Sequence, residues 1–246
     1  MVDLIQPHHR FVAVGMTGTG KSQVLLSIFA EDPGPRLLID VNDAYYMGET
    51  ALADPGGLQE TDDPAAIDWT ARTIRVVPPS AGKAARPWFD DLYAAIWARS
   101  EYNEQLGGLL VVLDESVGPT DANYAPPMLE LVITQGRKRR IRHGAAMQRP
   151  ANVYPGLLAQ SEHAFVFDVG SRRDDLDRIG ERFGWNGAEV GDALRELADE
   201  YGYEDADGFH CHGYLRHRLG RREVHRFPPL PPEVIAHANA HVVNAT

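Results

Sequence analysis

One eight-residue segment near the amino terminus constrains the fold more than any other part of the sequence. The segment Gly15-Met-Thr-Gly-Thr-Gly-Lys-Ser22 matches the pattern G-x-x-x-x-G-K-[ST] and directly follows the apolar run 10–14. Glycines let a backbone curl so that its N–H groups face phosphate oxygens, and a following helix presents its positive end to the same anion. A chance glycine turn is the alternative, but the strand before the segment and the helix after it favour a phosphate-binding loop.

The loop also predicts which residues bind a nucleoside triphosphate and its metal ion. Lys21 would reach the β- and γ-phosphates of ATP, and the hydroxyl of Ser22 would ligate Mg²⁺. The predicted nucleotide-binding residues are Gly15, Thr17, Gly18, Thr19, Gly20, Lys21 and Ser22.

Short β-branched runs alternate with helical segments along most of the chain. The expected strands are 10–14, 37–40, 74–77, 109–113, 145–148 and 164–167, and the expected helices are 21–30, 88–105, 127–139, 172–183 and 188–201. This alternation predicts an α/β fold, with a central, mostly parallel sheet flanked by helices on both faces. The segment 49–71, rich in Asp, Pro, Gly and Ala, is expected to be irregular, with a short helix at 65–71.

The pattern changes after residue 202. The runs 209–216 and 222–227, joined through 219–221, predict a β-hairpin, and a proline-rich stretch then precedes a short final helix. We expect a core of residues 1–202 and a C-terminal hairpin and proline-rich tail of residues 203–246. The tail is too small to form a core of its own, so we assign it to the same domain.

Two adjacent carboxylates end the most apolar of the expected strands, Leu109-Leu-Val-Val-Leu-Asp-Glu115. Ligands gather at the carboxyl ends of strands in open α/β sheets, so Asp114 is predicted to hold Mg²⁺ through its water shell. Glu115 is predicted to polarise the water that attacks the γ-phosphate, which a hydrolase needs and a P-loop kinase does not. The alternative for Glu115 is a helix-capping or solvated residue.

Gln148 ends the next expected strand, within the segment Gln148-Arg-Pro150. A polar residue at this position can contact both the attacking water and the γ-phosphate, and we favour that role. The alternative is a strand-end amide that caps the helix expected to start near residue 151.

Together these motifs resemble the HerA/FtsK superfamily of P-loop ATPases. The resemblance spans residues 11–169 and rests on the Gly15–Ser22 loop, the Leu-Asp-Glu115 strand end, Gln135-Gly-Arg-Lys138 and Gln148-Arg-Pro150. It implies a RecA-like fold of the ASCE type and ATP hydrolysis coupled to movement of double-stranded DNA.

The same resemblance implies a homo-oligomeric ring, usually a hexamer, in which an arginine of one subunit enters the ATP site of the next. Arg137 is the predicted arginine finger, with Arg140 in reserve. Such a finger neutralises charge on the γ-phosphate oxygens in the transition state.

The position of the loop narrows the choice within the superfamily. Chromosome-segregating members carry long membrane and linker regions and a winged-helix module, and HerA helicases carry an N-terminal β-barrel. Because the loop begins at Gly15, neither leading domain fits, and the bare motor is similar to the genome-packaging ATPases of membrane-containing icosahedral viruses. Packaging of a viral genome is therefore expected, with capsid or portal-vertex proteins as possible partners.

Three other functions remain open from the sequence. A cellular DNA translocase of the same superfamily is one. The second is an ATPase that drives protein assembly or extrusion, of the filamentous-phage type, whose relatives usually carry a membrane helix. The third is an ATP-binding switch without turnover, against which the Asp114–Glu115 pair argues.

The sequence departs from the family at the end of the second strand. Many relatives have a pattern like Asp-Pro-x-Gly-Glu-Tyr, whereas this chain has Asp40-Val-Asn-Asp-Ala-Tyr45. Ala44 stands where the glutamate would be, so no role of that glutamate carries over. Asp40 is either a site residue or a turn residue.

Charge and composition exclude further classes. The 246 residues include 24 Lys and Arg against 35 Asp and Glu, a net charge of −11, so the protein does not coat nucleic acid over its whole surface. Two local basic runs, 137–142 and 216–226, are candidates for phosphate contact. We favour the neighbour's ATP site for the first run, whereas the second is equally compatible with DNA contact and with plain surface.

Several observations predict the compartment. A single cysteine excludes an intrachain disulfide, and no apolar stretch approaches the roughly 18 residues that span a bilayer. The first residues lack the pattern of a signal peptide. We expect a soluble cytoplasmic protein, located in the host cytoplasm or the virion if it is viral.

Overall fold

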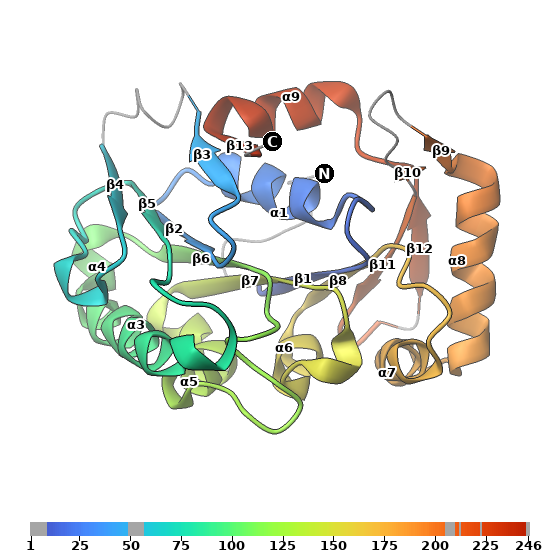
Figure 1. Ribbon diagram of the computed structural model, residues 1–246, viewed down its shortest axis with the longest axis horizontal. Coiled ribbons are helices and arrows are strands. Elements are labelled where there is room, and N and C mark those ends of the chain that lie inside the picture. The colour runs from blue at the N-terminus through green and yellow to red at the C-terminus, as the bar shows by residue number, and fades with distance from the viewer. Residues whose placement is uncertain (1–8, 49–56, 205–209, 212, 222, 245–246) are drawn as a thin grey trace.

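A nine-stranded sheet forms the centre of the computed structural model, which describes residues 9–48, 57–204, 210–211, 213–221 and 223–244. Its parallel strands are β1 (Phe11–Val14), β2 (Arg36–Asp40), β4 (Leu58–Thr61), β5 (Thr73–Val76), β6 (Leu109–Asp114), β7 (Ile141–Met147) and β8 (His163–Val166). Two antiparallel strands, β11 (Tyr214–Arg218) and β12 (Val224–Phe227), complete the order β12-β11-β8-β1-β7-β6-β2-β5-β4 (Figure 1). The predicted α/β fold is confirmed.

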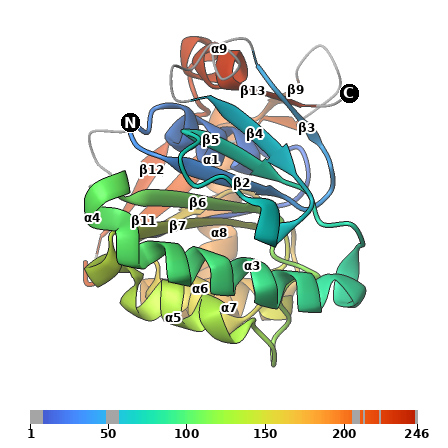
Figure 2. The same ribbon diagram turned by 90° about the vertical axis from the view of Figure 1, so that its left-hand side faces the viewer.

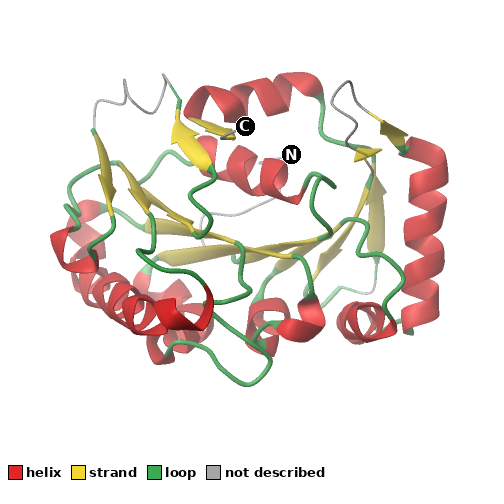
Figure 3. Ribbon diagram, in the orientation of Figure 1, coloured by secondary structure: helices red, strands yellow, loops and turns green. Residues whose placement is uncertain are grey.

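Helices cover both faces of this sheet. One face carries α1 (Lys21–Ala30) and α9 (Pro232–His241). The opposite face carries α3 (Arg86–Arg99), α5 (Pro127–Gln135), α6 (Pro155–Gln160) and α7 (Arg173–Phe183) (Figure 2). The short α4 (Asn103–Leu106) follows α3, and α8 (Gly187–Tyr201) packs against α7 beside the antiparallel end of the sheet (Figure 3).

Alternating side chains along the buried strands build two apolar cores. In β1, Phe11 and Ala13 pack with residues of α1, whereas Val12 and Val14 belong to the core on the other face. A strand covered on both faces needs apolar residues at successive positions. The continuous apolar run of β6 meets this need, since residues 109–113 are all fully buried.

The order of the strands decides what meets at their carboxyl ends. β7 lies between β1 and β6, with Val14 paired to Met147 and Leu113 paired to Ala145. Parallel strands end at the same edge of a sheet. The loop after β1 and the residues that follow β6 and β7 therefore share one edge, which we call the carboxyl edge.

The C-terminal segment attaches to this body at two places. The predicted hairpin is present as β11 and β12 and extends the sheet through β8, although residues 209, 212 and 222 of the prediction lie outside the described residues. Helix α9 then packs on α1, and β13 (Val242–Asn244) pairs antiparallel with β3 (Tyr45–Met47). The short pair β9 (Tyr203–Glu204) and β10 (His210–Cys211) lies between α8 and β11 in the sequence.

The structure differs from the expected element boundaries in several places. Part of the segment predicted to be irregular forms β4, a half-exposed edge strand that lacks the continuous apolar pattern of a central one. The expected helix at 65–71 is a 3₁₀ turn over Pro64–Ala66, and α5 ends at Gln135 before a second 3₁₀ turn over Gly136–Arg139. Residues 49–56 lie outside the described part.

Membrane-spanning character is not found among the helices that the structure describes. None of them combines the length and the apolar composition that crossing a bilayer requires.

Candidate functional site

The loop after β1 has the backbone that a phosphate cradle requires. Gly18 and Gly20 have φ values of 82° and 101°, in the left-handed region that glycine adopts without a steric penalty. Helix α1 begins at Lys21, directly behind the loop, so its positive end faces the space that the loop encloses. The backbone of this loop is therefore compatible with the predicted phosphate binding.

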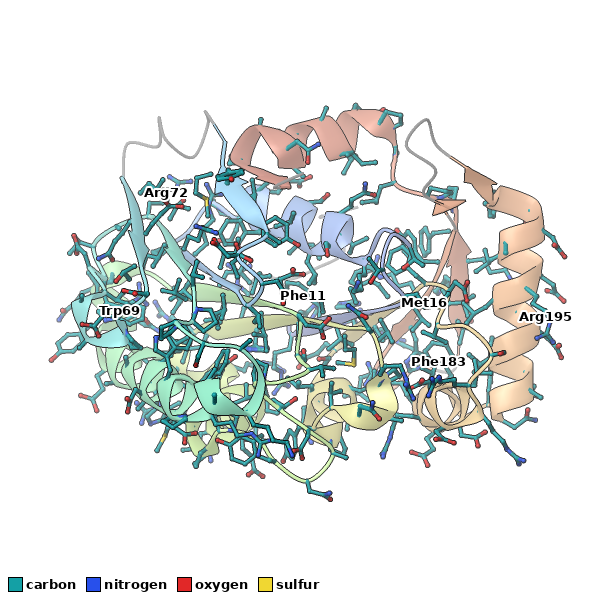
Figure 4. The ribbon with its side chains drawn as sticks, viewed as in Figure 1. Phe11, Met16, Trp69, Arg72, Phe183 and Arg195 are labelled. Atoms are coloured by element: carbon teal, nitrogen blue, oxygen red, sulfur yellow. The ribbon has the colours of Figure 1, made fainter. Side chains whose placement is uncertain are left out.

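Main-chain hydrogen bonds anchor this loop to the sheet. The N–H of Gly15 donates to the carbonyl oxygen of Met147 at 3.1 Å, and the N–H of Met16 donates to that of Asp168 at 2.8 Å. The buried hydroxyl of Thr19 donates to the Met16 carbonyl oxygen at 2.9 Å, so this threonine holds the loop together. Met16, which is labelled in Figure 4, and Thr17 are exposed.

Lys21 lies almost entirely inside the site, with only 7% of its surface exposed. Its Nζ is 3.5 Å from the carbonyl oxygen of Met16. Burial lowers the pKa of Lys21, while the nearby carboxylates of Asp114 and Glu115 act in the opposite direction. The structure therefore brings the lysine of the loop together with both predicted carboxylates.

Ser22 and Asp114, both predicted to hold Mg²⁺, are in contact with each other. The Ser22 hydroxyl donates to Oδ1 of Asp114 at 3.2 Å, across 92 positions of sequence. Burial raises the pKa of Asp114, and hydrogen bonds and the charge of Lys21 partly counteract this rise. A hydroxyl beside a carboxylate is the kind of oxygen donor set that Mg²⁺ prefers, so these residues fit the expected ion.

Glu115 and Gln148 come from neighbouring strands and contact each other. Burial raises the pKa of Glu115, and a hydrogen bond with the Gln148 side chain is among the contacts that lower it. The carboxylate Oε1 also accepts the N–H of Val117 at 3.0 Å, within its own turn. No helix begins among the described residues of this turn, so the contact with Val117 is not the helix cap of the alternative interpretation, and Gln148 is the neighbour that the catalytic interpretation requires.

Arg137 lies at the opposite end of the sheet from this site. It is exposed in the 3₁₀ turn over Gly136–Arg139, which precedes β7, whereas Gln148 follows the same strand. Seven strand residues span about 20 Å, so Arg137 does not reach the site of its own subunit. Arg140 is exposed at the same end of the sheet, where β7 begins and which we call the amino edge. Its role, like that of Arg137, stays a prediction.

The two basic runs are only partly free to contact a ligand. In the first, Arg139 stacks on Trp97, with 4.4 Å between the guanidinium carbon and the ring centre, and Arg142 is paired with Asp32. The exposed cations of this run are Arg137, Lys138 and Arg140.

In the second run the cations divide in a similar way. Arg216 is buried beside His163, and Arg226 is paired with Glu196. Arg218 and Arg221 are exposed, and Arg222 lies outside the described residues.

Tyr45 is a site residue that the motifs did not predict. Its hydroxyl donates to Oδ2 of Asp114 at 2.6 Å. Within the segment Asp40–Tyr45, the sequence left a site role open only for Asp40, because Ala44 replaces the family's glutamate. The tyrosine that ends the family pattern is the signal that could have indicated the contact of Tyr45 with Asp114. Asp40 itself has the structural role, because it accepts the N–H groups of Ala44 and Tyr45.

A second unpredicted contact holds the segment after Gln148. Asp175 of α7 is fully buried, accepts the Nε–H of Arg149 at 2.6 Å and accepts the N–H of Ala151 at 3.0 Å. Arg149, which follows Gln148, is therefore held against α7 by this ion pair.

The fold matches solved structures, although no protein-family profile and no curated protein matches the sequence. The genome packaging NTPase B204 from Sulfolobus turreted icosahedral virus 2, in complex with AMPPCP, is 14% identical with a TM-score of 0.66. The match covers 92% of this chain and 100% of that one. Another B204 structure contains ATP-gammaS.

Two further structures extend the likeness. VirB4 of Thermoanaerobacter pseudethanolicus is 11% identical with a TM-score of 0.61, and the match covers 94% of each chain. The cytoplasmic domain of the type VII secretion ATPase EccC from Thermomonospora curvata is 14% identical with a TM-score of 0.52, over 94% of this chain and 28% of that one. The chain thus has the fold of these P-loop ATPase structures.

The ion pair of Arg149 and Asp175 can be tested through its effect on the stability of the protein. Replacing Asp175 by Ala leaves Arg149 and the N–H of Ala151 without their acceptor. We expect the free energy of unfolding in urea to fall by about 2–3 kcal/mol, below the ~3–5 kcal/mol of a fully buried pair because Arg149 is partly exposed. The exposed neighbour Asp174→Ala is the control, and an equal loss in both variants would contradict this assignment.

Proposed function

We propose that the chain is an ATP-hydrolysing motor that moves double-stranded DNA and packages a viral genome. The observation that carries this proposal is the meeting of three groups at one edge of the sheet. They are the loop with Lys21, the pair of Ser22 and Asp114, and the pair of Glu115 and Gln148. This combination supports hydrolysis of a nucleoside triphosphate.

Each of these side chains has a task in hydrolysis. Lys21 and the N–H groups of the loop bind the β- and γ-phosphates, and Ser22 and Asp114 would hold Mg²⁺. Mg²⁺, when bound, neutralises charge on the phosphate oxygens. Glu115 accepts the proton of the attacking water, a task that its raised pKa favours, while Gln148 orients that water.

The packaging role is supported by structural likeness and by exposed positive charge. B204, a genome packaging NTPase, matches over its whole length, so its fold corresponds to nearly all of this chain. The exposed Arg218 and Arg221 would provide local contacts with DNA phosphates on an acidic protein. Capsid or portal-vertex proteins are the further partners that packaging requires.

A protein-moving ATPase is the second candidate. The likeness to EccC, a secretion ATPase, favours it. The two candidates differ in the polymer to which ATP turnover responds, and that response separates them.

Two substitutions test the hydrolytic site. Lys21→Ala removes the positive charge of the phosphate cradle, and we expect tight ATP binding to be lost. Glu115→Gln keeps the shape but not the base, so ATP should bind normally while turnover falls at least about 100-fold. Equilibrium binding of a fluorescent ATP analogue and a phosphate-release assay measure the two effects. Near-normal turnover by the Glu115 variant would remove this residue from the mechanism.

Double-stranded DNA should raise the ATPase rate of assembled rings several-fold. The stimulation should be larger at low salt than at high salt, because exposed cations on a chain of net charge −11 make only local, screened phosphate contacts. Steady-state phosphate release with and without DNA measures this, and heparin controls for any polyanion. A rate that ignores DNA at low salt supports the protein-moving candidate.

The arginine finger requires a neighbouring subunit. A closed ring joins different faces of successive subunits head to tail. In such a ring the carboxyl edge, with Asp114 and Glu115, faces another surface of the next subunit. The opposite end of the sheet, with exposed Arg137, has the positive charge that complements carboxylates and phosphates. This complementarity supports Arg137 acting in trans.

Arg137→Ala should therefore bind ATP normally but lose at least about 10³-fold in turnover, the lower end of what a finger contributes. Lys138→Ala, in the same exposed turn, is the control and should stay near wild type. Mixing Arg137→Ala with Lys21→Ala protein should restore activity, since mixed rings contain interfaces with both groups intact. Proven subunit exchange without rescue, or full activity of Arg137→Ala, would contradict the assignment.

A further inference from the structure

Tyr45 lies buried against the carboxylate of the metal site. Its hydroxyl donates to Oδ2 of Asp114 at 2.6 Å, and only 3% of its surface is exposed. The hydroxyl of Ser22 donates to Oδ1 of the same carboxylate. Two hydroxyl groups from different elements thus hold the two oxygens of Asp114, which fixes the plane of the carboxylate.

The main chain that carries Tyr45 is itself held by a buried carboxylate. Asp40 accepts the N–H of Ala44 at 2.9 Å through Oδ1 and that of Tyr45 at 3.0 Å through Oδ2. Arg75 of β5 donates to Oδ2 at 2.7 Å, so the negative charge of Asp40 is paired although the residue is fully buried. A buried charge with all its partners in place fixes the segment around it.

The C-terminal segment holds the same strand from the other side. β13 pairs with β3, and Asn244 lies opposite Tyr45 in the register. At the end of β3 the N–H of Gly48 donates to the carbonyl oxygen of His241 at 2.7 Å. Gly48 is so close to α9 that a Cβ would lie 2.4 Å from the carbonyl oxygen of Ala240.

The views agree on this arrangement. Figure 1 and Figure 2 both show α9 above α1, with β3 and β13 next to it. Helix α9 therefore packs on the helix that begins with Lys21, while the strand after α9 supports Tyr45.

We propose that Tyr45 is a positioning residue for Asp114 and that α9 and β13 keep it in place, which makes the C-terminal segment part of the metal–nucleotide site. The inference rests on the proposed ATPase function. With Oδ2 held by Tyr45, Oδ1 stays directed at Ser22, and Asp114 and Ser22 together would hold the ion. Groups that orient a metal ligand in this way commonly change metal affinity by about 10- to 100-fold.

Tyr45→Phe tests the hydroxyl alone, because the ring and its packing are kept. Mn²⁺ serves as the probe, and its binding in the presence of AMPPCP is followed by electron paramagnetic resonance. We expect Mn²⁺ to bind about 10-fold more weakly than to the wild type. Tyr46→Phe is the matched control, since Tyr46 is 67% exposed on the same strand and should bind Mn²⁺ as the wild type does.

A second readout separates positioning from a general structural defect. AMPPCP binding in EDTA, where no metal takes part, should be unchanged in Tyr45→Phe, and so should the melting temperature within a few degrees. Turnover at low Mg²⁺ should fall and should recover at high Mg²⁺, because only the affinity for the ion is altered. Unchanged Mn²⁺ affinity, or equal losses with and without metal, would overturn the positioning role.

Gly48→Ala tests whether the C-terminal segment contributes to metal binding. The added methyl group meets main chain of α9, so α9 and β13 must shift relative to β3 without any change at Tyr45 or Asp114. Mn²⁺ binding should weaken several-fold. Gly191→Ala is the control, because a Cβ there makes only ordinary contacts, the nearest at 3.4 Å.

The outcomes separate the inference from the function on which it rests. A wild-type protein that binds no Mn²⁺–AMPPCP overturns the proposed function and the inference together. A wild type that binds the complex, with Tyr45→Phe equal to it, overturns only the inference. Weak Mn²⁺ binding in Tyr45→Phe with normal binding in Gly48→Ala overturns the role of the C-terminal segment.

Discussion

The phosphate loop, the acidic pair and Gln148 depend on the two hydrogen-bonded ladders that join β7 to β1 and to β6. These ladders set Val14 opposite Met147 and Leu113 opposite Ala145, so the three strands end together. The phosphate loop and the acidic pair are nearly 100 positions apart in the sequence, and neither contacts the other without this pairing. Because all three strands are buried on both faces, a slip of one residue would move each side chain into the opposite core and would shift the residues that follow the strands out of line.

The carboxyl edge places several charges where little water reaches them, and each charge is paired. Asp40 is held by Arg75, Asp175 by Arg149, and Asp114 by two hydroxyl groups and the nearby Lys21. An uncompensated charge at such a position would be strongly destabilising. The same pairing that stabilises the edge also fixes the orientation of the side chains that chemistry requires.

Local patterns predicted much of this fold and site. The loop, the acidic pair and the C-terminal hairpin are each encoded in short, continuous stretches, and the structure has all three. Strand β4 was missed because an edge strand needs no apolar run. Tyr45 and Asp175 were missed because their roles depend on partners 69 and 26 positions away, and no spacing rule connects them. The position of Arg137 relative to the site also required the strand order.

Strand β7 connects the two ends of the sheet on which a ring would depend. It begins after the turn that carries Arg137 and ends before Gln148. Hydrogen bonds on both sides make this strand stiff, because moving one end alone would break ladder bonds to β1 or β6. In the ring that we propose, Gln148 faces the γ-phosphate of its own site while Arg137 enters the next one. The roles proposed for Gln148 and Arg137 then imply that a displacement of Gln148 on hydrolysis is transmitted along β7 to the arginine that serves the neighbouring site.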